Sequence, residues 1–455
     1  MSGQFFEGAA GTGKTYNLIK SLEYLVAPHD HSSHQKVLAL TFMHGSRARL
    51  DSSLSELKGL HKRFDCMTFD AFAGYIVNRW RDLLYGIQQG GNIASDKNEY
   101  EQLCYEAAKL LEKEVVRQWV SLTYPIVLVD EAQDLSHARL AMMKELATSS
   151  TLLAAADEYQ HLDEINSGNV SVKWLSDSLN VTRLQKIERT NDQGLLQVAH
   201  NLRNGEAIIP LLKDGYRGQK ELGSFVLLNA PTWQMLAWHA GFALRSGGES
   251  HAILTLSSND ANANNAINRL TQETQNLNRK RGTTFGPFSN VKQERKTEVV
   301  VQECLSSIGY PTGNLSISGA VERCAVIEDR NIRESVCGKI ARRKKISGQI
   351  EVSNEEIETI VKKAYQNKRR FQRRNNVRRQ AMTIHQAKNR EFDNVIVLWT
   401  YALSGKASDE YKRRLLYNAI TRAKKRCTVI VMGANRIYEA PFSLAVEKLS
   451  AENIF

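Results

Sequence analysis

Short apolar runs alternate with amphipathic stretches along the chain. The run Phe5–Phe6 precedes leucine and isoleucine residues at helical spacing from Leu18 to Leu25. A second apolar run, Lys36–Phe42, precedes leucines that share one helical face between Ser46 and Leu60. Buried parallel strands and the helices that cover them produce this alternation. The pattern predicts a doubly wound α/β domain.

The alternation continues to the end of the chain, with two interruptions. Further strands are expected at Ile126–Val129, Thr151–Ala156, Phe225–Leu228, Ala252–Leu256, Val395–Trp399 and Cys427–Met432. A polar helical pattern occupies 73–123, and a charge-rich stretch in which the order of elements is harder to read occupies 271–380. Because the α/β pattern restarts near Asn180, we expect a second α/β domain.

One segment fits the phosphate-binding pattern GxxxxGK[ST] without a mismatch. Its members are Gly8, Ala9, Ala10, Gly11, Thr12, Gly13, Lys14 and Thr15. The glycines let successive backbone N–H groups turn inward around an anion. Lys14 offers a charge to the β- and γ-phosphates of a nucleotide, and Thr15 offers a hydroxyl to Mg²⁺. A Gly-rich turn is the alternative, but the helix expected directly afterwards is the context that the motif requires.

Polar residues follow two of the expected strands. Asp130 and Glu131 come directly after Ile126–Val129, at the strand end where α/β sheets bind ligands. We predict that Asp130 holds Mg²⁺ and that Glu131 activates the attacking water. A solvated acidic turn is the alternative. Gln160, which follows another strand, is a candidate for orienting this water or sensing the γ-phosphate, with an ordinary loop residue as its alternative.

Composition indicates a globular protein. The chain has 455 residues, 42% of them hydrophobic and 24% charged, which predicts two to four domains. No apolar run approaches the roughly 20 residues of a membrane span, and the N-terminus lacks the features of a signal peptide. The six cysteines are scattered and are expected to be reduced thiols. We therefore expect a cytoplasmic protein with no membrane partner.

The charge of the chain favours a polyanionic partner. Its net charge is +12, and seven basic residues lie between Lys368 and Arg379, with Phe371 as the one aromatic residue of that run. The segment 341–345 is also strongly basic. A surface that tracks the phosphates of a nucleic acid would have this composition, and so would a solvated basic helix.

Taken in order, these segments resemble the motifs of UvrD/Rep/PcrA-like superfamily 1 DNA helicases. The segments that carry the resemblance are Gly8–Thr15 (motif I), Leu40–Phe42 (Ia), Thr68–Phe69 (Ib), Val129–Asp134 (II), Asp157–Gln160 (III), Glu188–Thr190 (IV), Thr383–Phe392 (V) and Ala419–Ala423 (VI). Motifs I, II and VI are specific, whereas III and IV are loose. The resemblance covers most of the chain.

The resemblance implies two RecA-like P-loop NTPase motor domains with parallel sheets and two small inserted subdomains. It assigns 1–72 and 124–180 to the first motor domain, 73–123 to a helical 1B-like insertion, 181–270 and 381–455 to the second motor domain, and 271–380 to a basic 2B-like insertion. ATP and Mg²⁺ would bind between the motor domains. Arg189 and Arg422 would reach the γ-phosphate, and Glu391 would contact the ribose. The DNA-facing positions that it implies are Thr41, Phe42, Thr68, Phe69, Thr383 and His385.

Our leading hypothesis is an ATP- and Mg²⁺-dependent motor on single-stranded DNA, or at junctions of single and double strands, that moves 3′ to 5′ as the resemblance implies. One alternative is a nucleotide-gated DNA-binding subunit that senses DNA ends or single strands for a partner nuclease or another effector. A motor directed by RNA is a third reading. Hydroxyl and aromatic side chains bind phosphates and stack on bases without reading their identity, so binding should be largely independent of sequence.

Overall fold

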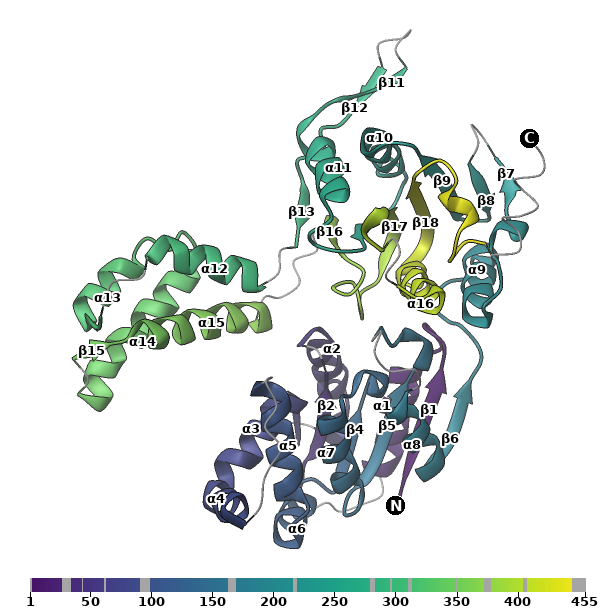
Figure 1. The fold of residues 1–455 in the computed structure, drawn as a ribbon. Coiled ribbons are helices and arrows are strands. Elements are labelled where there is room, and N and C mark those ends of the chain that lie inside the picture. The colour runs from purple at the N-terminus through teal and green to yellow at the C-terminus, as the bar shows by residue number, and fades with distance from the viewer. Residues whose placement is uncertain are drawn as a thin grey trace. The chain divides into compact units, whose positions relative to one another are not determined.

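The structure is a computed structural model that describes residues 2–26, 34–42, 44–60, 63–90, 99–162, 169–215, 219–278, 283–294, 297–309, 313–348, 350–371, 378–403 and 407–443. Contacts divide the chain into two compact units, Met1–Thr232 with Ile384–Phe455, and Trp233–Thr383. Figure 1 traces the elements of both.

A six-stranded sheet, parallel throughout, holds the N-terminal part of the first unit. Its strands run in the order β3-β2-β4-β5-β1-β6. They are β1 (Gly3–Gly8), β2 (Val37–Thr41), β3 (Phe64–Thr68), β4 (Ile126–Val129), β5 (Thr151–Ala156) and β6 (Asn180–Leu184). Four of the helices between them are α1 (Lys14–Val26), α2 (His44–Ser55), α7 (His137–Ala147) and α8 (Val170–Ser178). The predicted doubly wound domain is confirmed.

Both faces of this sheet are buried. Successive residues of a strand point to opposite sides of the sheet, so neighbouring residues belong to different hydrophobic clusters. Phe5, Leu38 and Leu40 lie in one hydrophobic cluster, while Phe6 and Ala39 lie in the other with Leu18 and Leu22 of α1. Burial on both sides explains why these strands are continuous apolar runs rather than alternating ones.

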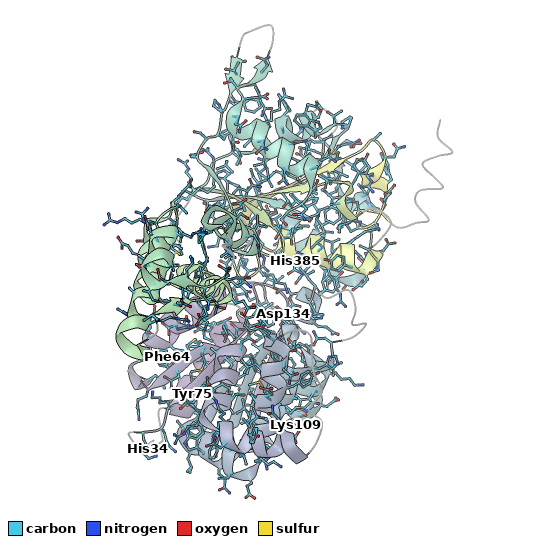
Figure 2. All side chains as sticks on the ribbon, turned by 60° about the vertical axis from the view of Figure 1, so that its left-hand side comes forward. His34, Phe64, Tyr75, Lys109, Asp134 and His385 are labelled. Carbon is cyan, nitrogen blue, oxygen red and sulfur yellow. The ribbon has the colours of Figure 1, made fainter. Side chains whose placement is uncertain are left out.

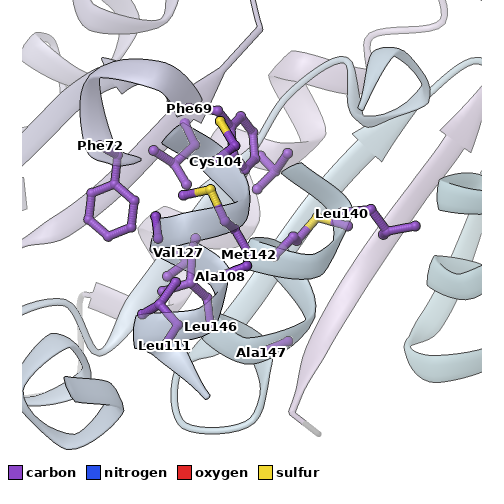
Figure 3. Close-up of a cluster of buried hydrophobic side chains, with 14 of the residues drawn as sticks. Phe69, Phe72, Cys104, Ala108, Leu111, Val127, Leu140, Met142, Leu146 and Ala147 are labelled. Atoms are coloured by element: carbon purple, nitrogen blue, oxygen red, sulfur yellow. The ribbon is translucent and has the colours of Figure 1, made fainter. Parts of the chain in front are cut away.

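The described part of the predicted helical segment 73–123 forms helices that pack onto one of these faces. They are α3 (Phe69–Arg79), α4 (Arg81–Gly90), α5 (Glu99–Leu111) and α6 (Glu114–Thr123). Cys104, Ala108 and Leu111 of α5 share a cluster with Val127 of β4 and Met142 of α7 (Figure 3). The segment therefore extends the core of the first sheet instead of forming a core of its own.

A second group of strands completes the first unit. β9 (Phe225–Ala230), β18 (Ala423–Met432) and β17 (Phe392–Trp399) pair in parallel, and β8 (Lys220–Leu222) and β7 (Lys213–Asp214) extend β9 as antiparallel strands. The helices here are α9 (Gln193–Asn204) and α16 (Asp409–Ile420). Helix α16 ends at Ile420, and Thr421 is its C-cap.

The position of β6 corrects one predicted boundary. Residues 181–270 were expected in the second motor domain, yet β6 pairs in parallel with β1, from Gln4 opposite Asn180 to Gly8 opposite Leu184. An edge strand joins a sheet through backbone hydrogen bonds, which leave no mark in the local pattern of residue types. The first α/β domain therefore extends through Leu184.

The second unit begins at Trp233, earlier than the predicted insertion 271–380. Residues 233–270, which were expected in the second motor domain, belong to this unit. It contains α10 (Trp233–Ala243), β10 (His251–Thr255), α11 (Ala261–Gln272), β11 (Gln275–Asn278), β12 (Thr283–Phe285), β13 (Val291–Gln293) and β16 (Arg379–Thr383). A separate helical core holds α12 (Thr297–Ile308), α13 (Ile317–Cys324), α14 (Arg330–Ser347) and α15 (Asn354–Phe371), with short strands β14 (Leu315–Ser316) and β15 (Glu351–Val352).

The remaining short elements are 3₁₀ turns, which are η1 (Lys58–Leu60), η2 (Ala132–Asp134), η3 (Glu158–Gln160), η4 (Ile209–Leu211), η6 (Tyr401–Leu403) and η7 (Arg436–Tyr438). Within the described ranges, no helix is long and apolar enough to cross a membrane.

Candidate nucleotide site

The loop from Gly8 to Thr15 joins β1 to α1, as its motif predicts. Gly11 and Gly13 have φ of 82° and 76°, a left-handed conformation that side chains disfavour. A Cβ on Gly8 would lie 2.5 Å from the Thr12 hydroxyl. Lys14 is buried, and its Nζ donates to the carbonyl oxygens of Gly8 at 2.9 Å and Ala9 at 3.0 Å. The backbone thus forms the turn, and its lysine is held at the loop.

The two predicted metal ligands lie together beside this loop. The Thr15 hydroxyl donates to Asp130 at 3.0 Å, from the end of β4. Burial and the adjacent Glu131 raise the pKa of Asp130 to about 6. A divalent cation would favour the ionised carboxylate and relieve this penalty, so the pair fits Mg²⁺, which prefers oxygen ligands.

Glu131 adopts a left-handed backbone conformation, with φ of 59°. This conformation is rare for a residue with a side chain and costs energy, and such residues are concentrated at functional sites. Gln133 Nε2 donates to the Glu131 carboxylate at 2.6 Å, while Gln133 Oε1 accepts the backbone N–H of Asp157 at 3.0 Å. Gln133 therefore orients Glu131 and joins motif II to motif III.

Asp157 is fully buried and contacts two cations. Its carboxylate lies 4.0 Å from Lys14 Nζ and accepts from Arg203 at 2.7 Å. Burial by itself raises the pKa of Asp157, but the charges of Lys14 and Arg203 outweigh it and hold the pKa below its usual value. Asp157 is thus ionised, and it is the counter-charge of the phosphate-loop lysine.

Replacing Asp157 by Asn is expected to destabilise the protein by about 3–5 kcal/mol near neutral pH, because Lys14 and Arg203 lose a buried counter-charge. A depressed carboxylate pKa gives stability that is present above the unfolded value of about 4 and is lost as pH falls through the folded value. The gap between the thermal midpoints of the wild type and the variant should therefore narrow below about pH 4. Asp214→Asn is the control, because Asp214 is 85% exposed. Equal midpoints at pH 7 would contradict this role.

Gln160 and Arg422, both predicted near the γ-phosphate, contact each other. Gln160 Nε2 donates to Asp157 at 2.8 Å, and its Oε1 accepts from Arg422 at 3.2 Å. Arg422 is 2% exposed, and burial together with the nearby Arg189 lowers its pKa to about 9. Its guanidinium therefore stays charged at neutral pH.

Arg189 lies beside the phosphate loop. A Cβ added to Gly11 would approach the Arg189 Cβ to 2.7 Å, and the backbone N–H of Glu188 donates to the Gly11 carbonyl at 2.7 Å. The guanidinium donates to Glu391 at 3.0 Å and to the Thr421 carbonyl at 2.6 Å. Burial raises the pKa of Glu391, but Arg189 and Lys424 reverse that effect and lower it. Glu391, expected at the ribose, is thus ion-paired with Arg189 here.

Sequence reasoning missed several residues that the fold brings to the site. Arg203 and Tyr417 contact Asp157, Lys388 pairs with Asp134 at 2.8 Å, and the Arg49 guanidinium donates to the Asn389 carbonyl. Asn389 has φ of 61°. Lys388 lies within motif V and Tyr417 lies two residues before motif VI, which is the one signal that could have identified them. Arg49 and Arg203 carry none.

The predicted DNA-facing residues are in mixed environments. Phe42 is 38% exposed, with the Arg139 guanidinium 5.2 Å from its ring centroid, and His385 is also exposed (Figure 2). Phe69 is wrong as a base-stacking residue, because its ring is 1% exposed and packs in the core as the first residue of α3. The Thr68 hydroxyl caps that helix by accepting from Ala71 N–H at 3.2 Å.

Thr41 and Thr383 are buried at the ends of β2 and β16. Most of the predicted basic run, 372–377 and the side chains of 366–371, lies outside the described residues, as do the side chains of Lys344 and Lys345. At the end of that run, Arg379 is placed with its guanidinium 5.1 Å from the ring centroid of Phe288.

Two protein-family models match the chain. The UvrD/REP helicase N-terminal domain matches residues 82–164, and the UvrD-like helicase C-terminal domain matches residues 380–430. The first range contains Asp130, Glu131 and Gln160, and the second contains Glu391 and Arg422. No curated protein sequence matches the chain.

Two solved helicase structures have a weak likeness to the chain. The chain is similar to a Bacteroides Pif1 helicase in complex with ADP-AlF3 and ssDNA, at 14% identity and a TM-score of 0.39, over 99% of this chain and 93% of that one. It is also similar to the arterivirus nonstructural protein 10 helicase in complex with DNA, at 10% identity and a TM-score of 0.35, over 96% of this chain and 62% of that one.

Proposed function

Because this chain is a superfamily 1 helicase of the UvrD/Rep type, we propose that it couples ATP hydrolysis to 3′-to-5′ movement along single-stranded DNA. The observation that carries the proposal is the placement of three cations at the phosphate loop and at Gln160. Lys14 belongs to the loop itself. Arg189 and Arg422 come from segments far away in the chain, and Arg189 lies beside Gly11 while Arg422 contacts Gln160.

Each residue has a role that its surroundings support. Lys14 and the loop N–H groups bind the phosphates, and Thr15 with Asp130 would hold Mg²⁺, which neutralises charge on the β- and γ-oxygens when bound. Glu131, oriented by Gln133, takes a proton from the attacking water, and Gln160 positions that water. Arg189 and Arg422 stabilise the charge that develops on the transferred phosphoryl group.

Contacts across the site link hydrolysis to movement. Arg189 leaves Glu391 when it turns toward a γ-phosphate, and Lys388 ties motif V to Asp134 of motif II. Nucleotide occupancy thereby changes the contacts of the segments that follow β16 and α16. Supplying transition-state cations from a second lobe makes hydrolysis depend on closure, and each closure and reopening is one step along the strand.

The partner of this motor is a polyanion bound without regard to sequence. The net charge of +12 and the exposed ring of Phe42 beside a guanidinium support a single strand held through phosphates and stacking.

Displacement of streptavidin from end-labelled oligonucleotides tests the motor directly. A 3′-to-5′ motor should clear streptavidin from a 5′-biotinylated DNA strand far faster than from a 3′-biotinylated one, and only with ATP. Matching RNA strands separate the DNA motor from an RNA motor. ATP hydrolysis without displacement from either end would contradict translocation and favour the nucleotide-gated subunit.

A further inference from the structure

The hydroxyl of Tyr417 occupies part of the phosphate loop. Tyr417 lies on α16 and is 2% exposed. Its oxygen accepts the backbone N–H of Ala10 at 3.0 Å. Ala10 is in the middle of the loop whose inward N–H groups bind phosphate in this class of site. One of those donors thus already has a partner within the protein.

The same hydroxyl has two further partners. It donates to the Asp157 carboxylate at 3.3 Å and accepts from Arg203 at 3.4 Å. Burial and the negative charge of Asp157 raise the pKa of Tyr417 well above its usual value, so the phenol stays neutral and keeps its proton. If the Ala10 N–H turns to a phosphate, the buried phenol still has a donor and an acceptor. Its release from the loop therefore leaves no buried polar group without a partner.

Lys14 is held by the same part of the protein. Its ammonium donates to the Gly8 and Ala9 carbonyls and lies 4.0 Å from Asp157, the residue that Tyr417 also contacts. The Ala10 N–H and the loop lysine therefore both have partners within the protein. A phosphate has to replace these contacts before it can bind.

We propose that the Tyr417 hydroxyl competes with nucleotide phosphate for the phosphate loop and thereby speeds the release of ADP. The inference rests on the proposed function of that loop. After hydrolysis the phenol returns to Ala10 N–H and takes the place of a phosphate oxygen. Tyr417 is thus a residue that lowers nucleotide affinity, in contrast to the loop residues that raise it.

The variant Tyr417→Phe removes the hydroxyl and keeps the ring. The variant keeps the edge-to-face contact with Tyr159, whose ring centroid is 5.0 Å away, but it leaves the Ala10 N–H without its partner in the free protein. A bound nucleotide still satisfies that N–H. Since one hydrogen bond changes an equilibrium by about 3- to 10-fold, ADP should bind more tightly and leave more slowly by this factor.

The test is the dissociation rate and Kd of methylanthraniloyl-ADP in the full-length protein, measured by stopped flow without DNA. Tyr159→Phe is the matched control, because its hydroxyl donates to the Leu202 carbonyl and not to the loop. Tyr417→Met gives a second variant without the hydroxyl should the Phe variant be unstable. Slower release in the Tyr417 variants, with Tyr159→Phe unchanged, is the expected result.

Unchanged or faster release in the Tyr417 variants would overturn the proposal, and faster release would make the hydroxyl a ligand of the nucleotide. An equal effect of Tyr159→Phe would overturn it as well, since the cause would then be packing. Because this assay needs neither hydrolysis nor DNA, its outcome is independent of whether the protein translocates.

Discussion

Replacing Glu131 by Gln is expected to reduce ATP hydrolysis about 10²- to 10⁴-fold, the usual contribution of a positioned general base. The amide keeps the size of the side chain and can still contact Gln133, which lies 2.6 Å from the Glu131 carboxylate. It cannot accept a proton from water. Nucleotide binding should persist, because Lys14, Thr15 and the loop N–H groups are untouched.

The measurement is the steady-state rate of phosphate release at saturating ATP and single-stranded DNA, together with the affinity for ATP. Glu112→Gln is the control, because Glu112 lies after α5 and pairs with Lys109 at 2.7 Å. Full hydrolysis by Glu131→Gln would remove Glu131 from the mechanism and leave its left-handed backbone unexplained.

Replacing Arg189 by Ala is expected to lower the maximal rate of hydrolysis about 10³-fold, the lower end of what a transition-state arginine supplies. Arg189 is adjacent to Gly11, and its guanidinium is within reach of both Glu391 and the end of α16. The fold should tolerate the change, because Glu391 keeps an ion pair with Lys424 at 3.2 Å. The KM for ATP should change much less than kcat, since the interaction is strongest in the transition state.

Arg183→Ala gives the comparison for Arg189. Arg183 is in the neighbouring strand β6, its side chain is 74% exposed, and it pairs with Glu7. Both variants remove one positive charge from the same segment, so a general charge effect would reduce both rates alike. A loss confined to KM in Arg189→Ala would also contradict the role, because it would show ground-state binding alone.

The parts of the candidate site whose geometry can be predicted from the sequence depend on local signals. The phosphate loop needs glycines at Gly11 and Gly13, where φ is positive, and a helix directly afterwards. Thr15 and Asp130 are brought within 3.0 Å because parallel strands deliver their C-terminal ends to one edge of the sheet. Residue type and strand order are enough to place such residues.

Residues that act through long-range packing leave no comparable signal. Tyr417 contacts Ala10, which lies 407 positions earlier in the chain. Arg203 contacts Asp157, which lies 46 positions earlier. Phe69 was predicted to face DNA because the motif places an aromatic residue at the junction of β3 and α3. In the structure its ring lies in the hydrophobic core. β6 likewise follows the pattern of a new domain but joins the first sheet.

The decisive measurement is the rate of ATP hydrolysis by the wild-type protein as single-stranded DNA is added. A nucleotide-driven motor should show a low basal rate that rises strongly with added single strand and saturates, and hydrolysis should be lost in Glu131→Gln at every DNA concentration. A hydrolysis rate that does not change with single-stranded DNA, in a protein that binds that DNA, would contradict a nucleotide-driven motor.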